Sequence, residues 1–244
     1  MNMPSRASAR LGYWTALGAV ATFAIFSVCF VAIPLSGPVF RWTDLPAYVA
    51  WTQTQPQGLA ILARLCMLFF CPLLVGLFAA IVDCAAETTR VWARLGLCFA
   101  AIFAALTGMS YFVQLTAVRF SVGRGELAGL EQVTQANPYS MISAVNMAGW
   151  TLFLPLASLC AAAVFSGGRL ERLIRFAFLF NGVVCLAGGI GFMLDLTVVV
   201  FWTVNFGMGG AVLLAAISLS VWFRRLSSGP AAEQRPVPTQ LRSG

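Results

Sequence analysis

The chain has 244 residues, of which 60% are hydrophobic and 9% are charged, and its net charge is +7. A soluble domain has about 25% charged residues, so this composition excludes a water-exposed globular fold and predicts a polytopic membrane protein. All 15 basic residues are arginine and histidine is absent, which excludes histidine bases, histidine metal ligands and histidine-bound haem. The arginines flank apolar runs and form no basic face, so we expect no nucleic acid partner.

The N-terminal part of the chain predicts a retained first span. Residues 1–11 are short and basic, and the uncharged apolar run 12–34 follows them. A signal peptide has an apolar core of roughly 7–15 residues before a small-residue cleavage site, and this longer run has no such site. In the polar connection that follows, Asp44 and Pro46 predict a surface helix over residues 44–53, with three aromatic rings at the headgroups, Trp42, Tyr48 and Trp51.

Further apolar runs predict an all-α bundle of six transmembrane helices within residues 12–223. A helix needs about 20 residues to cross a hydrocarbon core of roughly 30 Å. Backbone groups in lipid must be paired internally, and the runs lack the alternation of barrel strands. The spans after the first are expected at about residues 58–82, 95–118, 138–165, 173–194 and 197–223.

The connections carry their own signals. A charged turn covers 83–94, and a basic turn covers 166–175. In the long connection 119–137, residues 126–134 predict a second surface helix, and Asn137 with Pro138 predicts the start of the fourth span. The polar, proline-containing tail 224–244 is predicted to be disordered and cytoplasmic.

Arginine placement predicts the orientation. The two termini and the turns 83–94 and 166–175 together hold eleven arginines, whereas the opposite side holds Arg41, Arg119 and Arg124. The positive-inside rule therefore predicts that both termini are cytoplasmic, residues 1–11 included. We expect a multi-pass protein of the bacterial cytoplasmic (inner) membrane.

No pattern in the sequence indicates a cofactor or a metal site. The seven cysteines lie in or beside apolar runs and form no Cys-x-x-Cys pair, as expected for small apolar residues in helices. There is no Walker loop, nucleophile elbow or dinucleotide fingerprint. We therefore predict no bound metal and no cofactor.

Six polar side chains are predicted to share the outer half of the membrane. Polar groups at such depths usually face the bundle interior, because lipid would leave them unpaired. We therefore interpret them as candidate ligand-binding residues of a pocket that opens to the outer side: Arg64, Tyr111, Gln114, Asn146, Asp195 and Asn205.

Simpler readings of these residues stay open. Arg64 either snorkels to the headgroups or pairs with Asp195 across the bundle. Asn146 and Asn205 are also interpretable as residues that hydrogen-bond between helices, and Tyr111 as an aromatic-belt residue. Asp195 is also interpretable as the cap of the turn before the sixth span. Separately, glycines predict close packing of spans five and six, at positions 182, 188, 189, 191, 207, 209 and 210.

Three segments resemble a family of uncharacterised bacterial multi-pass integral membrane proteins. They are Tyr111–Arg119 (YFVQLTAVR), Gln135–Pro138 (QANP) and Leu170–Arg175 (LERLIR). The resemblance covers roughly spans three to five and implies a membrane-helix fold in a bacterial inner membrane. The family has no settled activity, so the resemblance implies no catalytic roles.

Three functions are compatible with the sequence. The first is a pocket that binds a small or amphiphilic ligand or a partner helix. The expected partners are membrane lipids and either such a ligand or another membrane protein. The second is a membrane enzyme acting on a lipid or isoprenoid, with Asp44 or Asp195 as the acid and Tyr111 near a developing cation. The third is an accessory subunit whose polar residues pair with another membrane protein.

Overall fold

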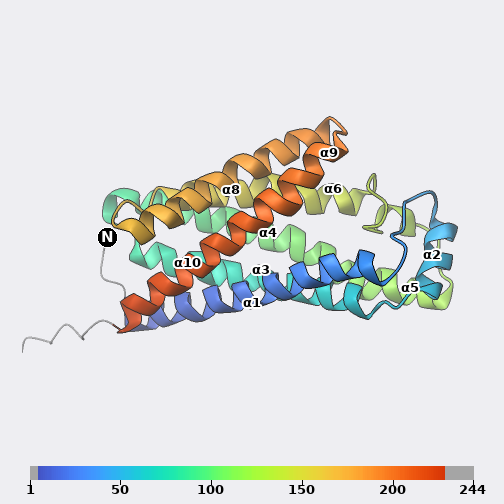
Figure 1. The fold of residues 1–244 in the computed structure, drawn as a ribbon, viewed down its shortest axis with the longest axis horizontal. Coiled ribbons are helices and arrows are strands. Elements are labelled where there is room, and N and C mark those ends of the chain that lie inside the picture. Colours follow the sequence, from blue (N-terminus) through green and yellow to red (C-terminus); the bar gives the residue numbers. More distant parts are fainter. Residues whose placement is uncertain (1–4, 229–244) are drawn as a thin grey trace, which may run out of the picture.

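Six apolar helices in residues 5–228, the part of the chain that the computed structural model describes, are each long enough to cross a membrane. The residues described contain no β-strand, so the predicted all-α bundle of six membrane-spanning helices is confirmed. The helices run along one long axis, and α1 begins at the same end of the bundle at which α10 finishes (Figure 1). We call the opposite end, which carries α2 and α5, the α2 end.

Three of the six spans are uninterrupted helices, and three contain a π-helical segment. The uninterrupted ones are α1 (Arg6–Ser36), α3 (Gly58–Cys84) and α8 (Arg169–Met193). The third span joins η1 (Glu87–Thr89), α4 (Arg90–Val113), the π segment η2 (Gln114–Val118) and α5 (Arg119–Arg124). The fourth joins α6 (Met141–Ala148), the π segment η4 (Gly149–Phe153) and α7 (Leu154–Ala162), and the sixth joins α9 (Thr197–Val200), the π segment η5 (Phe201–Met208) and α10 (Gly209–Ser228).

The sequence gives a local reason for two of these π segments. Proline has no N–H, and its ring clashes with the carbonyl four residues back, so Pro155 breaks the regular hydrogen bond to Thr151 inside η4. In η5, the Nδ2 of Asn205 donates to the carbonyl of Phe201 at 3.0 Å, so this backbone carbonyl has a side-chain donor. Widened turns of this kind occur frequently at functional sites.

The connection between α1 and α3 contains the predicted surface helix, α2 (Leu45–Thr54). Asp44 is its N-cap, because its Oδ1 accepts from the N–H of Ala47 at 2.8 Å. An aromatic cluster of Phe40, Trp42, Tyr48 and Trp51 surrounds this helix, with neighbouring ring centroids 5.5–6.3 Å apart. The prediction of a helix at residues 44–53 is therefore confirmed.

The predicted second surface helix over 126–134 is wrong. Only a short 3₁₀ turn, η3 (Leu130–Gln132), forms there. The glycines before it, Gly125 and Gly129, have φ values of 74° and 76°, a left-handed conformation that ends a right-handed helix. The apolar side chain of Leu130 is nevertheless buried against Leu45 and Tyr48.

Several predicted boundaries also move. The fourth span begins at Met141 and not at Pro138, because the N-cap is Ser140, whose hydroxyl accepts from the N–H of Ser143 at 3.2 Å. The third span continues past residue 118 to Arg124, and the sixth continues past 223 to Ser228. Residues 224–228 are thus helical, and the rest of the tail predicted to be disordered lies outside the residues described.

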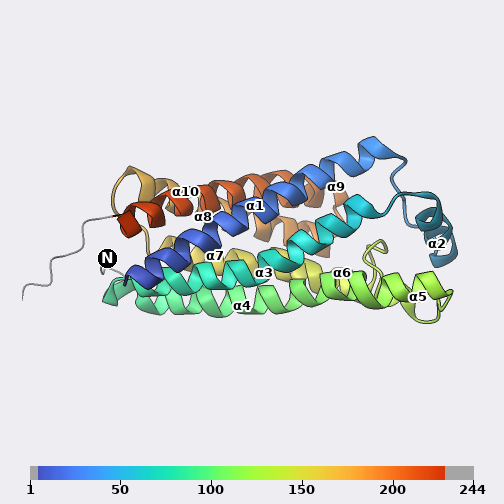
Figure 2. The same ribbon diagram turned by 90° about the horizontal axis from the view of Figure 1, so that it is seen from below.

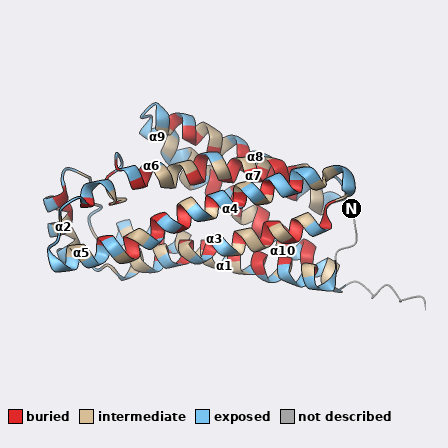
Figure 3. Ribbon diagram, turned by 180° about the vertical axis from the view of Figure 1, so that it is seen from behind, coloured by how far each residue is buried: buried red, intermediate tan, exposed pale blue. Residues whose placement is uncertain are grey.

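Aromatic and small side chains fill the core. Helix α1 packs against α3 and α10, and α4 packs against α3 and α7 (Figure 2). Phe23, Phe70, Phe103 and Trp150 form one aromatic cluster, in which the Phe103 and Trp150 centroids lie 4.8 Å apart in an edge-to-face arrangement. Buried residues face inward, whereas exposed ones, many of them large and apolar, face outward along the spans (Figure 3). This pattern is that of a multi-pass membrane protein, whose outer surface meets lipid.

Glycines bring α8 and the sixth span together at three positions. A Cβ on Gly188 would lie 2.7 Å from Thr203 Oγ1, and one on Gly191 would lie 2.8 Å from Val199 Cγ1. A Cβ on Gly207 would lie 3.3 Å from Val184. For these positions, the predicted close packing of spans five and six is confirmed.

Other glycines of the same set face elsewhere. Gly182 and Gly189 lie against Leu159 and Thr151 of the fourth span, at 2.5 Å and 2.9 Å from an added Cβ. Gly210 meets nothing within 4 Å, so its predicted packing role is wrong.

Candidate functional site

A cavity of about 530 Å³ lies in the half of the bundle toward the α2 end. Its walls come from α1, from Tyr111 of α4, from the junction of α6 and η4, and from η5 with the start of α10. We call it the lateral cavity, and it is lined by Phe23, Phe26, Ser27, Phe30, Val31, Tyr111, Asn146, Met147, Trp150, Val204, Asn205, Phe206, Met208, Gly209, Gly210 and Leu213.

The lateral cavity opens where α1 and the sixth span separate. Near the termini these helices pack tightly, because a Cβ added to Gly12 would lie within 2.5 Å of the Phe223 ring. Toward the α2 end they diverge (Figure 1). The lining residues Val31 of α1 and Phe206 of the sixth span are 60% and 56% exposed. The cavity is therefore reached from the lipid-facing side of the bundle.

Three of the six predicted site residues meet in this cavity. Tyr111 is buried, whereas Asn146 and Asn205 are half-buried, and the three come from different spans. The Oδ1 of Asn146 is buried without a hydrogen-bond partner among the residues described. Asn205 uses its Nδ2 on the Phe201 carbonyl, which leaves its Oδ1 as an acceptor. The remaining wall is apolar and largely aromatic.

Such a combination can hold a ligand with a long apolar part and a small polar part. Ligand pockets are commonly about 300–1,000 Å³, mostly apolar, with a few polar groups that fix orientation. The Phe23 and Trp150 rings, joined through Phe70, close one wall of the cavity with a rigid apolar surface. The amides of Asn146 and Asn205 offer both donors and acceptors to a hydroxyl, ester or amide.

Gln114 lies outside the lateral cavity, and its side chain bonds to the connection between α5 and α6. Its side chain is 1% exposed, and its Nε2 donates to the carbonyl of Val133 at 2.6 Å. Its Oε1 accepts from the N–H of Gln135 at 3.1 Å. Both functional groups of the amide are thus used to hold the segment between α5 and α6 against the third span.

Arg64 lies outside the lateral cavity and lines another one. This second cavity, of about 340 Å³, lies between α2, α3 and the third span. Arg64 is half-buried there, and Gln114 and Arg119 share the wall with it. Among residues 5–228 Arg64 forms no ion pair, so the direct Arg64–Asp195 contact is absent from the structure.

Asp195 lines a third cavity, of about 460 Å³, with Tyr139 and Phe192. Its role as cap of the sixth span is wrong, because the N-cap of α9 is Leu196 and no side chain bonds there. Asp195 instead ends α8 in a left-handed conformation with φ 54°. Leu196 N–H donates to the carbonyl of Gly191 at 2.7 Å, and Asp195 N–H to that of Phe192 at 3.2 Å, which is a Schellman arrangement.

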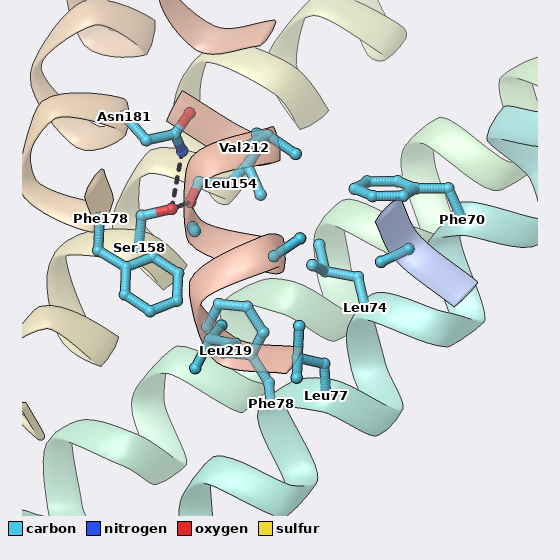
Figure 4. A pocket seen from close by; sticks show the side chains of 13 residues that line it. Phe70, Leu74, Leu77, Phe78, Leu154, Ser158, Phe178, Asn181, Val212 and Leu219 are labelled. Carbon is cyan, nitrogen blue, oxygen red and sulfur yellow. Dashed lines mark hydrogen bonds between the residues drawn. The ribbon is translucent and has the colours of Figure 1, made fainter. Parts of the chain in front are cut away.

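A buried polar pair that we did not predict lies deeper in the bundle. The Nδ2 of Asn181 in α8 donates to Ser158 Oγ in α7 at 2.8 Å (Figure 4). Ser158 in turn donates to the carbonyl of Leu154 at 2.9 Å, and the Cys185 thiol contacts Asn181 Oδ1 at 3.5 Å. Phe178, Leu154 and other apolar side chains line a small cavity of about 20 Å³ around the pair, which links α7 to α8.

The aromatic wall of the lateral cavity also escaped prediction from the sequence. Phe23, Met147 and Trp150 resemble ordinary core residues in an apolar run, and only their contact with an open space distinguishes them. The one local signal was Pro155, which predicts a distorted turn next to Trp150.

Comparisons with known proteins returned no matching family model, no matching curated protein and no matching solved structure. The resemblance of segments such as Tyr111–Arg119 to a bacterial membrane protein family therefore stays a prediction.

Proposed function

We propose that this chain is a binding protein of the bacterial cytoplasmic membrane that takes up an amphiphilic molecule into the lateral cavity. The observation that carries this proposal is the position of Tyr111, Asn146 and Asn205 in an apolar cavity that opens toward lipid. The arginine distribution supports cytoplasmic termini, which would place the cavity in the outer leaflet. An amphiphile would enter sideways from that leaflet, its chain on the aromatic wall and its polar group on the amides.

The lining chemistry favours binding over acid–base catalysis. An enzyme acting on a lipid or isoprenoid needs an acid at the reacting atoms, and the lateral cavity has no carboxylate among its lining residues. The two candidate acids lie elsewhere, since Asp44 caps α2 and Asp195 lines the third cavity. The accessory-subunit alternative has less support, because Asn146 and Asn205 line this cavity and so are available to a ligand.

A plugged cavity provides the test. Gly210 lines the cavity and has nothing within 4 Å of an added Cβ, so we expect Gly210→Phe to occupy part of that space at little cost to helix packing. Ile217→Phe is the matched control, because Ile217 is 48% exposed on the same helix and lines no part of the cavity. The probe is a phosphatidylglycerol with a photoreactive diazirine in its acyl chain, incorporated into nanodiscs with the purified protein.

We expect labelling of the peptide that contains Met147 and Trp150 in the wild type and in Ile217→Phe, and a loss of that labelling in Gly210→Phe. Equal labelling of that peptide in Gly210→Phe, or labelling confined to outward-facing residues in the wild type, would contradict the proposal.

A further inference from the structure

The second cavity is lined by positively charged residues and by no carboxylate. Its two charged lining residues are Arg64 of α3 and Arg119 of α5, and no carboxylate lines it. Among residues 5–228 the one ion pair joins Arg90 to Glu87 at the far end of the bundle, and no hydrogen bond is made by either the Arg64 or the Arg119 guanidinium. Arg64 is half-buried, whereas Arg119 is exposed and its guanidinium carbon lies 6.0 Å from the centroid of the Phe120 ring, so both arginines line this cavity without a carboxylate partner. We call it the arginine cavity.

Hydrogen bonds that do not involve the guanidinium groups hold the walls of this cavity. Gln57 Nε2 donates to the carbonyls of Thr52 at 3.3 Å and Gln55 at 3.2 Å, which fixes the turn between α2 and α3. On the other side, the bonds from Gln114 to Val133 and Gln135 fix the third span at the level of the cavity. The two arginines are thus presented by elements whose positions do not depend on the guanidinium groups.

The π segment η2 helps to aim Arg119. A regular α-helix turns about 100° per residue, and a π turn accommodates roughly one extra residue. Because η2 lies immediately before Arg119, it rotates the start of α5 by about that amount relative to an uninterrupted helix. Arg119 then lines the arginine cavity together with Gln114, Val118 and Arg64.

We propose that the arginine cavity binds a phosphate group at the membrane surface. Guanidinium groups form paired, charge-assisted hydrogen bonds to phosphate oxygens, and two of them match its charge. Gln53, which also lines the cavity, adds an uncharged amide donor. A half-buried arginine near the end of a span is costly without a partner, and a bound phosphate removes that cost. This site is separate from the lateral cavity, and its occupation does not depend on the proposed function.

The phosphate can belong to a lipid headgroup or to a soluble molecule, and the test separates the two. The thermal unfolding temperature of the purified protein in detergent is measured with four additions at constant ionic strength: phosphatidylglycerol, diacylglycerol of the same chains, inorganic phosphate, and buffer alone. Native mass spectrometry counts the phosphatidylglycerol molecules that stay bound.

The variants are Arg64→Ala, Arg119→Ala and the charge-conserving Arg64→Lys. The matched control is Arg124→Ala, because Arg124 lies on the same short helix as Arg119 and does not line the cavity. We expect loss of either cavity arginine to weaken phosphate-dependent stabilisation by about tenfold in concentration, and Arg64→Lys to weaken it less. Arg124→Ala should behave as the wild type.

Each outcome has a definite meaning. Stabilisation by phosphatidylglycerol beyond diacylglycerol, with no effect of inorganic phosphate, supports a lipid phosphate. Stabilisation by inorganic phosphate alone supports a soluble one. Equal effects of the two lipids together with no effect of phosphate, or equal losses in Arg124→Ala and Arg64→Ala, overturn the proposal. If Arg64→Ala does not fold, the comparison of Arg64→Lys and Arg119→Ala with the control decides.

Discussion

Gln114 holds Val133 by a hydrogen bond of 2.6 Å between its side-chain Nε2 and the Val133 carbonyl, across 19 residues of chain. The same side chain accepts from the N–H of Gln135. The bond is possible because Gln114 is the first residue of η2 and points inward at the level where the connection returns to the bundle. The hydrogen bonds of one buried amide thus hold this segment, for which the sequence predicted a surface helix.

Gln114→Leu should lower stability and loosen the connection. The substitution leaves the Val133 carbonyl and the Gln135 N–H without partners, and each buried group left unpaired costs about 1–3 kcal/mol. The measurement is thermal unfolding in detergent, combined with the labelling rate of a cysteine introduced as Ala136→Cys. Thr116→Val is the control, because Thr116 bonds only to Phe112 in its own span. Unchanged labelling in Gln114→Leu would refute the clamp.

Asp195 should tolerate glycine better than alanine. A positive φ costs a residue with a side chain about 1–2 kcal/mol, although aspartate bears it better than most, and glycine bears none of it. We expect Asp195→Gly to match or exceed the wild-type unfolding temperature and Asp195→Ala to fall below it. The reverse order would show that the carboxylate contributes more than the backbone conformation does.

Arg64 and Asp195 should contribute independently. They line different cavities, and no ion pair joins them within the described chain. In a double-mutant cycle of Arg64→Ala and Asp195→Ala, the changes in free energy of unfolding should therefore add to within about 0.5 kcal/mol. A larger coupling energy would revive the cross-bundle contact that the sequence suggested.

Asn181 and Ser158 should show the opposite behaviour. Hydrogen bonds between membrane helices average about 0.6 kcal/mol in double-mutant cycles and reach about 1.7 kcal/mol. Because this pair is buried and its amide has no other oxygen to donate to among its contacts, we expect a coupling of that order between Asn181→Leu and Ser158→Ala. The measurement is unfolding in detergent, and a coupling near zero would mean that the two residues act separately.

Gly188 and Gly210 should respond differently to a larger side chain. A Cβ on Gly188 would lie 2.7 Å from Thr203 Oγ1, whereas one on Gly210 meets nothing. We expect Gly188→Leu to lower the unfolding temperature markedly and Gly210→Leu to leave it nearly unchanged. Similar losses at both positions would contradict the packing of α8 against the sixth span.

Prediction from the sequence succeeded where one local property decides the structure. Apolar length fixes the spans, and Asp44 followed by Pro46 fixes the start of α2, because a cap acts within its own turn. Prediction failed where the position of a side chain depends on a partner that is distant in the sequence. Depth in the membrane placed Arg64, Asn146 and Asp195 at one level, but depth says nothing about the direction in which a side chain leaves its helix.

The candidate site was recovered only in part for the same reason. Tyr111, Asn146 and Asn205 share a cavity because their spans surround the same space. Gln114 lies one turn after Tyr111 and is also buried, but its amide bonds to the connection, because Val133 and Gln135 return to the bundle at its level. A sequence periodicity of 3.6 residues does not identify such a distant partner.

The π segments have a consequence for how this chain can be altered. A π segment accommodates about one residue more than an ordinary helix, so deleting one residue from η2 should restore the regular repeat there, whereas Pro155 would keep the turn at η4 distorted. A chain shortened in this way keeps its six spans and their order, but everything beyond the deletion turns by about 100°. The number of residues in such a segment therefore determines the rotation of the helix that follows, and with it which side chains face each cavity.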